Sequence, residues 1–249
     1  MRIAILLYGQ PRDYMRGYSH IMNFIRLQTN IEVDFFYHAW ILEKGNTYDI
    51  GAFADKDKQV LRHSDNIKDI LYELYSPKCF EYELQKLDWT IDTDTIGYVN
   101  LHPTSDKLRI TRTNISQAYT RNKVRNIFNA YLQSTGIIYD TAVITRFDLA
   151  QPVDYILNGR DLSKVYVGKM HLPRKIFPDH FIIAPAAVII KWFTLFDDYL
   201  CITNSKLSYD KMKSYNEVLS NISEAIIFAK YLLEFNNVND VCYAFDVTC

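Results

Sequence analysis

Glycine is scarce in this chain, and the short signature motifs of several enzyme classes are missing. Only eight of the 249 residues are glycine. The sequence has no P-loop, no G-x-S-x-G nucleophile elbow and no H-E-x-x-H zinc motif. These absences argue against P-loop ATPases, α/β-hydrolases and zinc metalloproteases.

Long apolar runs and paired cysteines are also missing. The four cysteines, at positions 79, 201, 242 and 249, show neither C-x-x-C spacing nor zinc-type pairing with the six histidines, which indicates free thiols in a reducing compartment. The apolar run over residues 1–9 is too short for a signal peptide, and the run over 181–193 falls short of the roughly 20 residues of a membrane span. We therefore expect a cytoplasmic protein without a transmembrane segment, either free or peripheral at a membrane face.

A surplus of charge of one sign is absent from the chain as a whole. The formal net charge is -1, which argues against the overall basic surface that nucleic-acid binding needs. Positive charge gathers only over residues 102–125, where six basic residues accompany the single acidic Asp106: Lys107, Arg109, Arg112, Arg121, Lys123 and Arg125. This segment either meets an anionic ligand or forms the solvated face of a helix.

The sequence does contain a regular alternation of apolar strands and amphipathic helices. The first half predicts strands over residues 2–8, 33–37 and 79–84, with helices over 14–28 and 66–75. The second half predicts helices over 114–134, 186–199 and 224–235, and strands over 139–146, 164–168, 180–184 and 241–245. Residues 85–111 show no period and are expected to form a long loop. This order predicts an α/β, Rossmann-like three-layer fold with a mixed, mostly parallel sheet flanked by helices.

Arg146 and Asp148 form the most informative pair in the chain. A short β-branched apolar run over residues 139–145 ends in Arg146-Phe147-Asp148. Ligands of open α/β sheets bind at the carboxyl ends of parallel strands, so both side chains are expected to face a ligand crevice. An arginine beside a carboxylate suits a diphosphate and its divalent metal; a strand-end salt bridge is the alternative.

A second acidic pair, Asp92 and Asp94, forms a literal Asp-x-Asp. No buried strand leads into it, and a rigid strand end holds a metal ligand better than a loop does. We therefore prefer Asp148 as the metal ligand and Arg146 as the diphosphate partner, and expect Asp92 and Asp94 in a solvated turn.

Over most of its length the chain resembles a largely uncharacterised glycosyltransferase-like family of the GT-A type, found in bacteria and large DNA viruses. The resemblance lies in ordered segments: 3–12, 33–40, the helix around Gln117, 139–149, 179–184 and Ser223-Glu224. It implies a single GT-A-like domain over residues 1–249, with a nucleotide-binding half over about 1–100 and a metal and acceptor half over about 101–249. Arg-x-Asp stands where many GT-A enzymes carry Asp-x-Asp. With one carboxylate fewer, the dependence on Mn²⁺ or Mg²⁺ is expected to be weak, or Arg146 to replace part of the ion's charge.

The candidates for the nucleotide site lie at the ends of two predicted strands. Gly9, Gln10 and Arg12 follow the first strand, and His38 and Trp40 follow the second, so they converge on one rim. Arg121 and Arg146 complete the donor-binding set. Each candidate in the first group has a structural alternative: Gly9 as a turn former, Arg12 in a surface ion pair, Trp40 in the core, and His38 as a buried, hydrogen-bonded histidine.

Two carboxylates are candidates for the general base that an inverting transferase needs to deprotonate its acceptor. Asp179 begins a predicted strand after a loop over residues 169–178. Glu224 lies in the first turn of a predicted helix, where the helix dipole lowers the pKa and weakens the base. Asp179 is therefore preferred, and a retaining mechanism without such a base stays open.

The sequence thus predicts a glycosyltransferase that moves a sugar from a nucleoside-diphosphate sugar to a glycan or lipid-linked acceptor. Arg146 and Asp148 are assigned to the diphosphate and the divalent metal. One alternative is a catalytically inactive nucleotide-binding module of the same fold. The other is a sulfuryl or phosphoryl transferase that uses residues 107–125 for an anionic donor.

Overall fold

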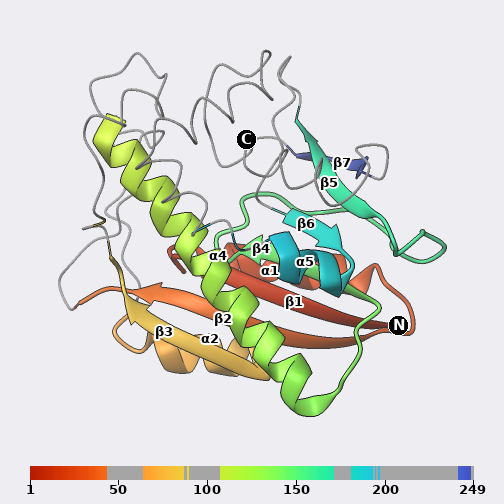
Figure 1. The fold of residues 1–249 in the computed structure, drawn as a ribbon, viewed down its shortest axis with the longest axis horizontal. Helices are drawn as coiled ribbons and strands as arrows, with labels where there is room; N and C mark the ends of the chain where they lie inside the picture. The colour runs from red at the N-terminus through yellow and green to blue at the C-terminus, as the bar shows by residue number, and fades with distance from the viewer. Residues whose placement is uncertain are drawn as a thin grey trace.

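A seven-stranded β-sheet with helices on both faces forms the centre of the protein (Figure 1). The computed structural model describes residues 1–43, 64–86, 89, 107–170, 181–192, 194, 196 and 241–247. Within these ranges, no helix has the length and apolar character to cross a bilayer. The predicted fold class, a mixed and mostly parallel sheet flanked by helices, is confirmed.

The strands lie in the order β3-β2-β1-β4-β6-β5-β7. Their bounds are β1 Arg2–Gly9, β2 Glu32–Ile41, β3 Cys79–Leu84, β4 Thr141–Arg146, β5 Val165–Met170, β6 Phe181–Ala184 and β7 Val241–Val247. The pairs of β1 with β2, β2 with β3, β1 with β4 and β5 with β7 are parallel. Only β6, among the described strands, pairs antiparallel to its neighbours β4 and β5.

The helices divide between the two faces of the sheet (Figure 1). One face packs against α1 (Tyr14–Arg26) and α2 (Ile67–Tyr75), and the other against α4 (Lys107–Thr135) and α5 (Ala186–Trp192). Alternate residues of β1 enter the two cores, Ile3, Ile5 and Leu7 towards α1, and Ala4, Leu6 and Tyr8 towards α4. Burial on both faces explains why β1 has a continuous apolar run in the sequence.

Two elements extend by four residues or more beyond one of their predicted bounds. The helix expected from residue 114 begins at Lys107, so the end of the expected loop over 85–111 is helical. Lysine and arginine are good helix formers, and these residues continue the helix without a clear apolar period. β2 runs to Ile41 and not to residue 37, because its last residues pair with β3. His38 and Trp40 therefore lie within the strand and not in a loop after it.

Candidate functional site

The order of the strands reverses at β1. From β1 the chain moves outward to β2 and β3 on one side, whereas β4 pairs with β1 on the other side, and all four strands are parallel. The carboxyl ends of β1 and β4 therefore border a topological switch point, which is where ligands bind in open α/β sheets. Gly9 ends β1 and Arg146 ends β4 at this edge of the sheet.

Two arginines and an aspartate meet at the switch point. Arg146 donates two hydrogen bonds to Asp148, from Nε to Oδ1 at 2.7 Å and from Nη2 to Oδ2 at 2.8 Å. Arg12, from the loop between β1 and α1, donates from Nε to Oδ2 of the same carboxylate. The side chain of Asp148 is 7% exposed, that of Arg12 is 18% exposed and that of Arg146 is 17% exposed. The carboxylate is thus enclosed, while part of each arginine side chain reaches the surface.

Close packing of α1 against the chain that follows β4 brings Arg12 to Asp148. Gly9 has a φ of +94°, a conformation that side chains disfavour, and the chain turns here from β1 towards α1. Gly17 in α1 lies so close to β4 that a Cβ atom there would be 1.8 Å from the carbonyl oxygen of Phe147. Two glycines therefore allow the loop that carries Arg12 to reach the end of β4.

A third arginine joins this group from α4. Tyr8 lies opposite Arg146 in the register of β1 and β4. Arg121 is 1% exposed, donates from Nη2 to the hydroxyl of Tyr8, and places its guanidinium carbon 4.4 Å from the centre of the Tyr8 ring. We call Arg12, Arg121, Arg146, Tyr8 and Asp148 the arginine cluster. Its three arginines and one carboxylate leave a surplus of two positive charges.

The pKa of Asp148 is held far below its ordinary value. Burial alone would raise this pKa, but the charges of Arg146 and Arg12 and their hydrogen bonds outweigh burial. Both carboxylate oxygens already accept hydrogen bonds from guanidinium groups, and the two positive charges beside them oppose the approach of a divalent cation. These residues do not fit a divalent metal ion bound to Asp148, and its predicted metal role has no support in the geometry.

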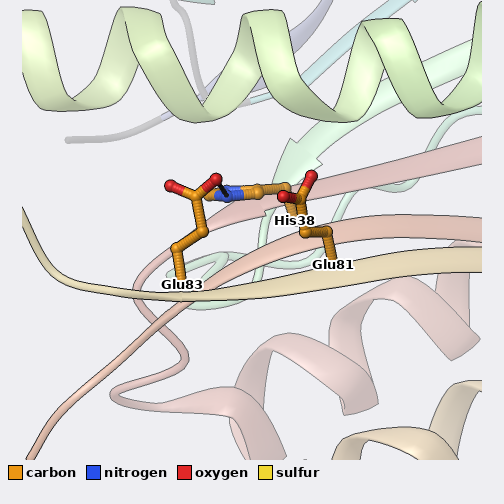
Figure 2. Close-up of side chains that lie close together, drawn as sticks. All are labelled: His38, Glu81 and Glu83. Atoms are coloured by element: carbon orange, nitrogen blue, oxygen red, sulfur yellow. Dashed lines mark ion pairs between the residues drawn. The ribbon is translucent and has the colours of Figure 1, made fainter.

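A second group of polar side chains lies beside the arginine cluster, on β2 and β3 (Figure 2). His38 of β2 is in register with Tyr8 of β1 on one side and with Glu81 of β3 on the other. Glu83 follows two residues later on the same face of β3. One ligand atom from each of His38, Glu81 and Glu83 lies within 4.8 Å of the other two. We call these three residues the His-Glu cluster.

Side chains of α4 contact both glutamates of this cluster. Lys123 Nζ lies 2.6 Å from Glu83 Oε1 and 3.2 Å from Glu81 Oε1. Tyr119 donates its hydroxyl to Glu83 Oε2 at 2.9 Å. Burial would raise the pKa of Glu83, but hydrogen bonds from Lys123 and Tyr119 outweigh it and lower the pKa. The Glu83 carboxylate is therefore ionised at neutral pH.

His38 is fully buried, yet neither ring nitrogen has a hydrogen-bond partner in the described part of the chain. Its Nε2 lies 3.7 Å from Glu83 Oε1. Burial lowers the pKa of His38 to about 4, so the imidazole is neutral at pH 7. An unsatisfied buried group of this kind costs about 1–3 kcal/mol. The structural alternative for His38 is thus correct about burial and wrong about hydrogen bonding.

The two glutamates of this cluster were not predicted as site residues. The sequence predicted the strand over residues 79–84 and a role for His38, but no role for Glu81 or Glu83. Two acids at alternate positions of a strand place both carboxylates on one face, and this signal was available in the sequence. Their position beside His38 depends on the register of β2 and β3, which separate parts of the chain determine together.

Of the remaining predicted site residues, the structure describes Gln10 and Trp40. Gln10 is half-buried and follows Gly9 at the carboxyl edge. Trp40 is 1% exposed and stacks on Tyr119, with ring centroids 5.3 Å apart and an interplanar angle of 11°, which places it in the core under α4. Four predicted carboxylates lie outside the described residues: Asp92, Asp94, Asp179 and Glu224.

Comparison with known proteins gives similarity only at the level of structure. No protein-family model matches the sequence, and no curated protein matches it. The chain is similar to the galactosyltransferase LgtC in complex with donor and acceptor sugar analogs, with 12% identity and a TM-score of 0.41 over 98% of this chain and 73% of that one. An active-site mutant of LgtC gives 13% identity and a TM-score of 0.40 over 98% and 72% of the chains. The bifunctional glycosyltransferase WbbM gives 12% identity and a TM-score of 0.36 over 79% of this chain and 34% of that one. At these TM-scores the likeness establishes neither a fold family nor a function for this chain.

Proposed function

We propose that the protein is a glycosyltransferase that binds a nucleoside-diphosphate sugar at the carboxyl ends of β1 and β4. It transfers the sugar to a glycan or lipid-linked acceptor. The observation that carries this proposal is the arginine cluster at the switch point of the sheet. The resemblance of the sequence to GT-A-type glycosyltransferases supports the same reaction.

Arg12 and Arg146 suit the charge that develops in this reaction. Breaking the bond between the sugar and the diphosphate leaves additional negative charge on the departing phosphate oxygens, and the reaction is accelerated by positive groups already placed there. The planar guanidinium group matches phosphate oxygens in pairs. Asp148 holds both guanidinium groups in place before the donor arrives, so less conformational freedom is lost on binding.

The arginines also give a reason to expect that donor binding depends only weakly on a divalent metal ion. A divalent ion such as Mn²⁺ or Mg²⁺ supplies positive charge to a diphosphate when it binds. In this chain Arg12 and Arg146 supply two positive charges at the same edge of the sheet, of which Asp148 neutralises one. We therefore expect donor binding to persist in the absence of Mn²⁺ and Mg²⁺.

The general base is proposed from the sequence alone. Asp179 is the first candidate for deprotonating the acceptor hydroxyl, and Glu224 is the second. The predicted position of Glu224 in the first turn of a helix favours its charged form and makes it the weaker base.

The contacts of the basic segment argue against the sulfuryl or phosphoryl transferase alternative. Lys123 pairs with Glu81 and Glu83, and Arg125 donates from Nε to the carbonyl oxygen of Ile190 at 2.6 Å. Arg121 is buried against Tyr8. Lys123 and Arg125 are thus used in contacts away from the arginine cluster, and Arg121 belongs to that cluster, so these three residues do not form a separate basic surface for another anionic donor.

The first experiment is a thermal-shift panel of nucleoside diphosphates and nucleotide sugars, with and without Mn²⁺. A ligand at a hundred times its Kd stabilises the native state by about 2.7 kcal/mol, which is a clear rise in Tm. The matched variants are Arg12→Gln and Arg146→Gln at the carboxyl edge, and Arg2→Gln at the amino edge of the same sheet. Each shift is measured against the Tm of the same variant without ligand.

We expect one nucleotide family to stabilise the wild type, and Arg12→Gln or Arg146→Gln to weaken binding about tenfold or more, because a hydrogen bond to a charged group contributes roughly 1.5–3 kcal/mol. Arg2→Gln should retain the wild-type affinity. Equal affinity in all four proteins would contradict the proposed site. Donor binding without sugar release to any acceptor or to water would favour the inactive nucleotide-binding module.

A further inference from the structure

We propose that His38, Glu81 and Glu83 bind one divalent transition-metal ion of the Zn²⁺ type between β2 and β3. The site lies on the face of the sheet covered by α4 (Figure 2). It is separate from Asp148, and it does not depend on the proposed glycosyl transfer.

The three side chains are arranged as ligands of a single ion. Figure 2 shows the His38 ring lying between the carboxylates of Glu81 and Glu83, which rise from β3 on the same side. Zinc bonds to nitrogen and oxygen are about 2.0–2.2 Å long, so two ligand atoms of one ion lie roughly 3–4 Å apart. The distance of 3.7 Å between His38 Nε2 and Glu83 Oε1 falls within this range. All three ligand atoms lie within 4.8 Å of one another, so a small movement of the glutamate side chains places them around one ion.

His38 is the observation that points to a ligand. Its ring is fully buried, faces the two carboxylates, and has no hydrogen-bond partner among the described residues. Packing fixes the ring, because Trp40 contacts it at a centroid distance of 5.1 Å and Tyr119 at 6.0 Å. Buried polar groups in proteins nearly always have a partner, and an ion bound to Nε2 would be the partner of that nitrogen.

The net charge of the His-Glu cluster and Lys123 is negative, which favours a bound cation. Glu81 and Glu83 carry two negative charges, and Lys123 is the one cation that pairs with them in the described part of the chain. Lys123 Nζ contacts the same Oε1 atom of Glu83 that lies nearest to His38, so the ammonium group and the metal ion compete for this position. The Lys123 side chain is 29% exposed and can move towards solvent when the ion binds. Tyr119 continues to hold the other oxygen of Glu83.

The ligand types favour zinc over magnesium and calcium. Mg²⁺ and Ca²⁺ prefer sets made of oxygen atoms, whereas an imidazole nitrogen suits Zn²⁺ and other first-row transition metals. Three protein ligands leave a fourth position of a tetrahedral zinc ion open to water or another molecule.

The rival account is that the two glutamates only hold Lys123 against the sheet. Lys123→Met separates the two accounts, because it removes the ammonium group and retains the apolar stem. If the ion competes with Lys123, this variant binds metal more tightly. If the cluster exists only for Lys123, the variant gains no affinity for metal.

The test is calorimetric titration of the full chain with Zn²⁺, after alkylation of its cysteine thiols, together with the visible absorption of bound Co²⁺. The variants are Glu83→Gln, Lys123→Met and the control Glu32→Gln, which changes an exposed glutamate at the other end of β2. Glu81→Gln replaces Glu83→Gln if the latter does not fold, since the Glu81 side chain is 41% exposed.

We expect one ion per chain in the wild type and in Glu32→Gln. Glu83→Gln should bind at least about tenfold more weakly, since even residues that only orient a metal ligand contribute 10–100-fold to affinity. Lys123→Met should bind more tightly than the wild type. No binding by the wild type, equal affinity in Glu83→Gln, or no gain in affinity in Lys123→Met would each overturn the proposal.

Discussion

Asp148 is the residue on which the geometry of the arginine cluster depends. It contacts Arg12 and Arg146 through both carboxylate oxygens and is itself almost fully enclosed. Each of these contacts is a charge-assisted hydrogen bond, which is shorter and stronger than a neutral one. Asp148 thus holds two guanidinium groups in fixed positions, and in the proposed function these groups and not Asp148 contact the donor.

Removing the charge of Asp148 should destabilise the protein, because two arginines would be left beside a neutral group. We expect Asp148→Asn to lower the free energy of unfolding by about 3–5 kcal/mol at pH 7, measured by urea denaturation. The pKa of Asp148 is lowered in the folded state, so its contribution is present above the unfolded pKa near 3.9 and is lost as the pH falls below that value. The variant should therefore lose less stability than the wild type when the pH falls below about 4.

Asp154→Asn is the matched control at an exposed aspartate, and it should change the free energy of unfolding by less than about 0.5 kcal/mol. A wild-type unfolding curve for Asp148→Asn would show that the two arginines do not depend on this carboxylate.

The sequence predicted part of this site at the scale of single residues. Arg146 and Asp148 were identifiable because they follow a buried strand directly, and Arg12 because it follows another strand that ends at the same edge. That Asp148 joins the two arginines was not predictable, since it depends on how closely α1 approaches β4.

The approach of α1 to β4 is the element-scale feature that holds the site together. Gly17 lies in the middle of the interface, and a Cβ atom there would also be 2.8 Å from the carbonyl carbon of Phe147 and 3.1 Å from the nitrogen of Leu149. Backbone atoms cannot move aside as a flexible side chain can. The two elements must therefore separate if this position carries any side chain.

Gly17→Ala should destabilise the protein, although alanine is the better helix former. In an open helix interior the change would stabilise by about 1 kcal/mol. Here we expect overpacking to cost a net of roughly 1–3 kcal/mol, measured by urea denaturation. The shift of α1 should also carry Arg12 away from Asp148 and weaken nucleotide binding in the thermal-shift assay.

Met15→Ala in the same helix is the control, because the Met15 side chain is 56% exposed and does not enter the interface with β4. It should leave both stability and binding close to wild type. If Gly17→Ala were as stable as Met15→Ala, then the contact between α1 and β4 would be looser than the structure indicates.

The bounds of elements with strong apolar patterns were predicted well. The bounds of elements whose length depends on pairing with another strand were not. β1 and α1 appear close to their predicted bounds because burial fixes their periodicity. β2 ends four residues later than predicted, since pairing with β3 continues it through Ile41. The same pairing creates the His-Glu cluster, which explains why this cluster was missed.

At the scale of the whole molecule, the two edges of the parallel part of the sheet differ in their chemistry. At the amino edge, Asp34 accepts hydrogen bonds from Arg2 Nη2 at 2.7 Å and from the Tyr139 hydroxyl at 2.8 Å, and pairs with Lys78 at 3.3 Å. Arg2 also pairs with Glu32 at 3.9 Å, so the two positive and two negative charges of this network balance within the protein. The arginine cluster at the carboxyl edge retains a surplus of positive charge. Ligand binding is thus assigned to the carboxyl edge alone, whereas both edges of the sheet contribute to stability.

The sequence predicted a mixed sheet but not the place of each strand in it. The strand over residues 180–184 was predicted from its apolar run, and β6 occupies Phe181–Ala184. Its antiparallel direction between β4 and β5 is a property of pairing between distant segments, which apolar periodicity does not encode. The parallel order around β1 was expected from the alternation of strands and helices, and this order produces the switch point.

The division between the two edges can be tested with one substitution at each edge. Asp34→Asn removes the charge shared by Arg2 and Lys78, and should lower the free energy of unfolding by about 1–3 kcal/mol, because Arg2 and Lys78 are partly exposed and water replaces some of the lost interaction. It should leave the affinity for the nucleotide ligand unchanged. Arg146→Gln should lower that affinity about tenfold or more. Urea denaturation and ligand titration of both variants measure the two effects separately. If Asp34→Asn weakened ligand binding as much as Arg146→Gln, the ligand would not be confined to the carboxyl edge, and the arginine cluster would not be its site.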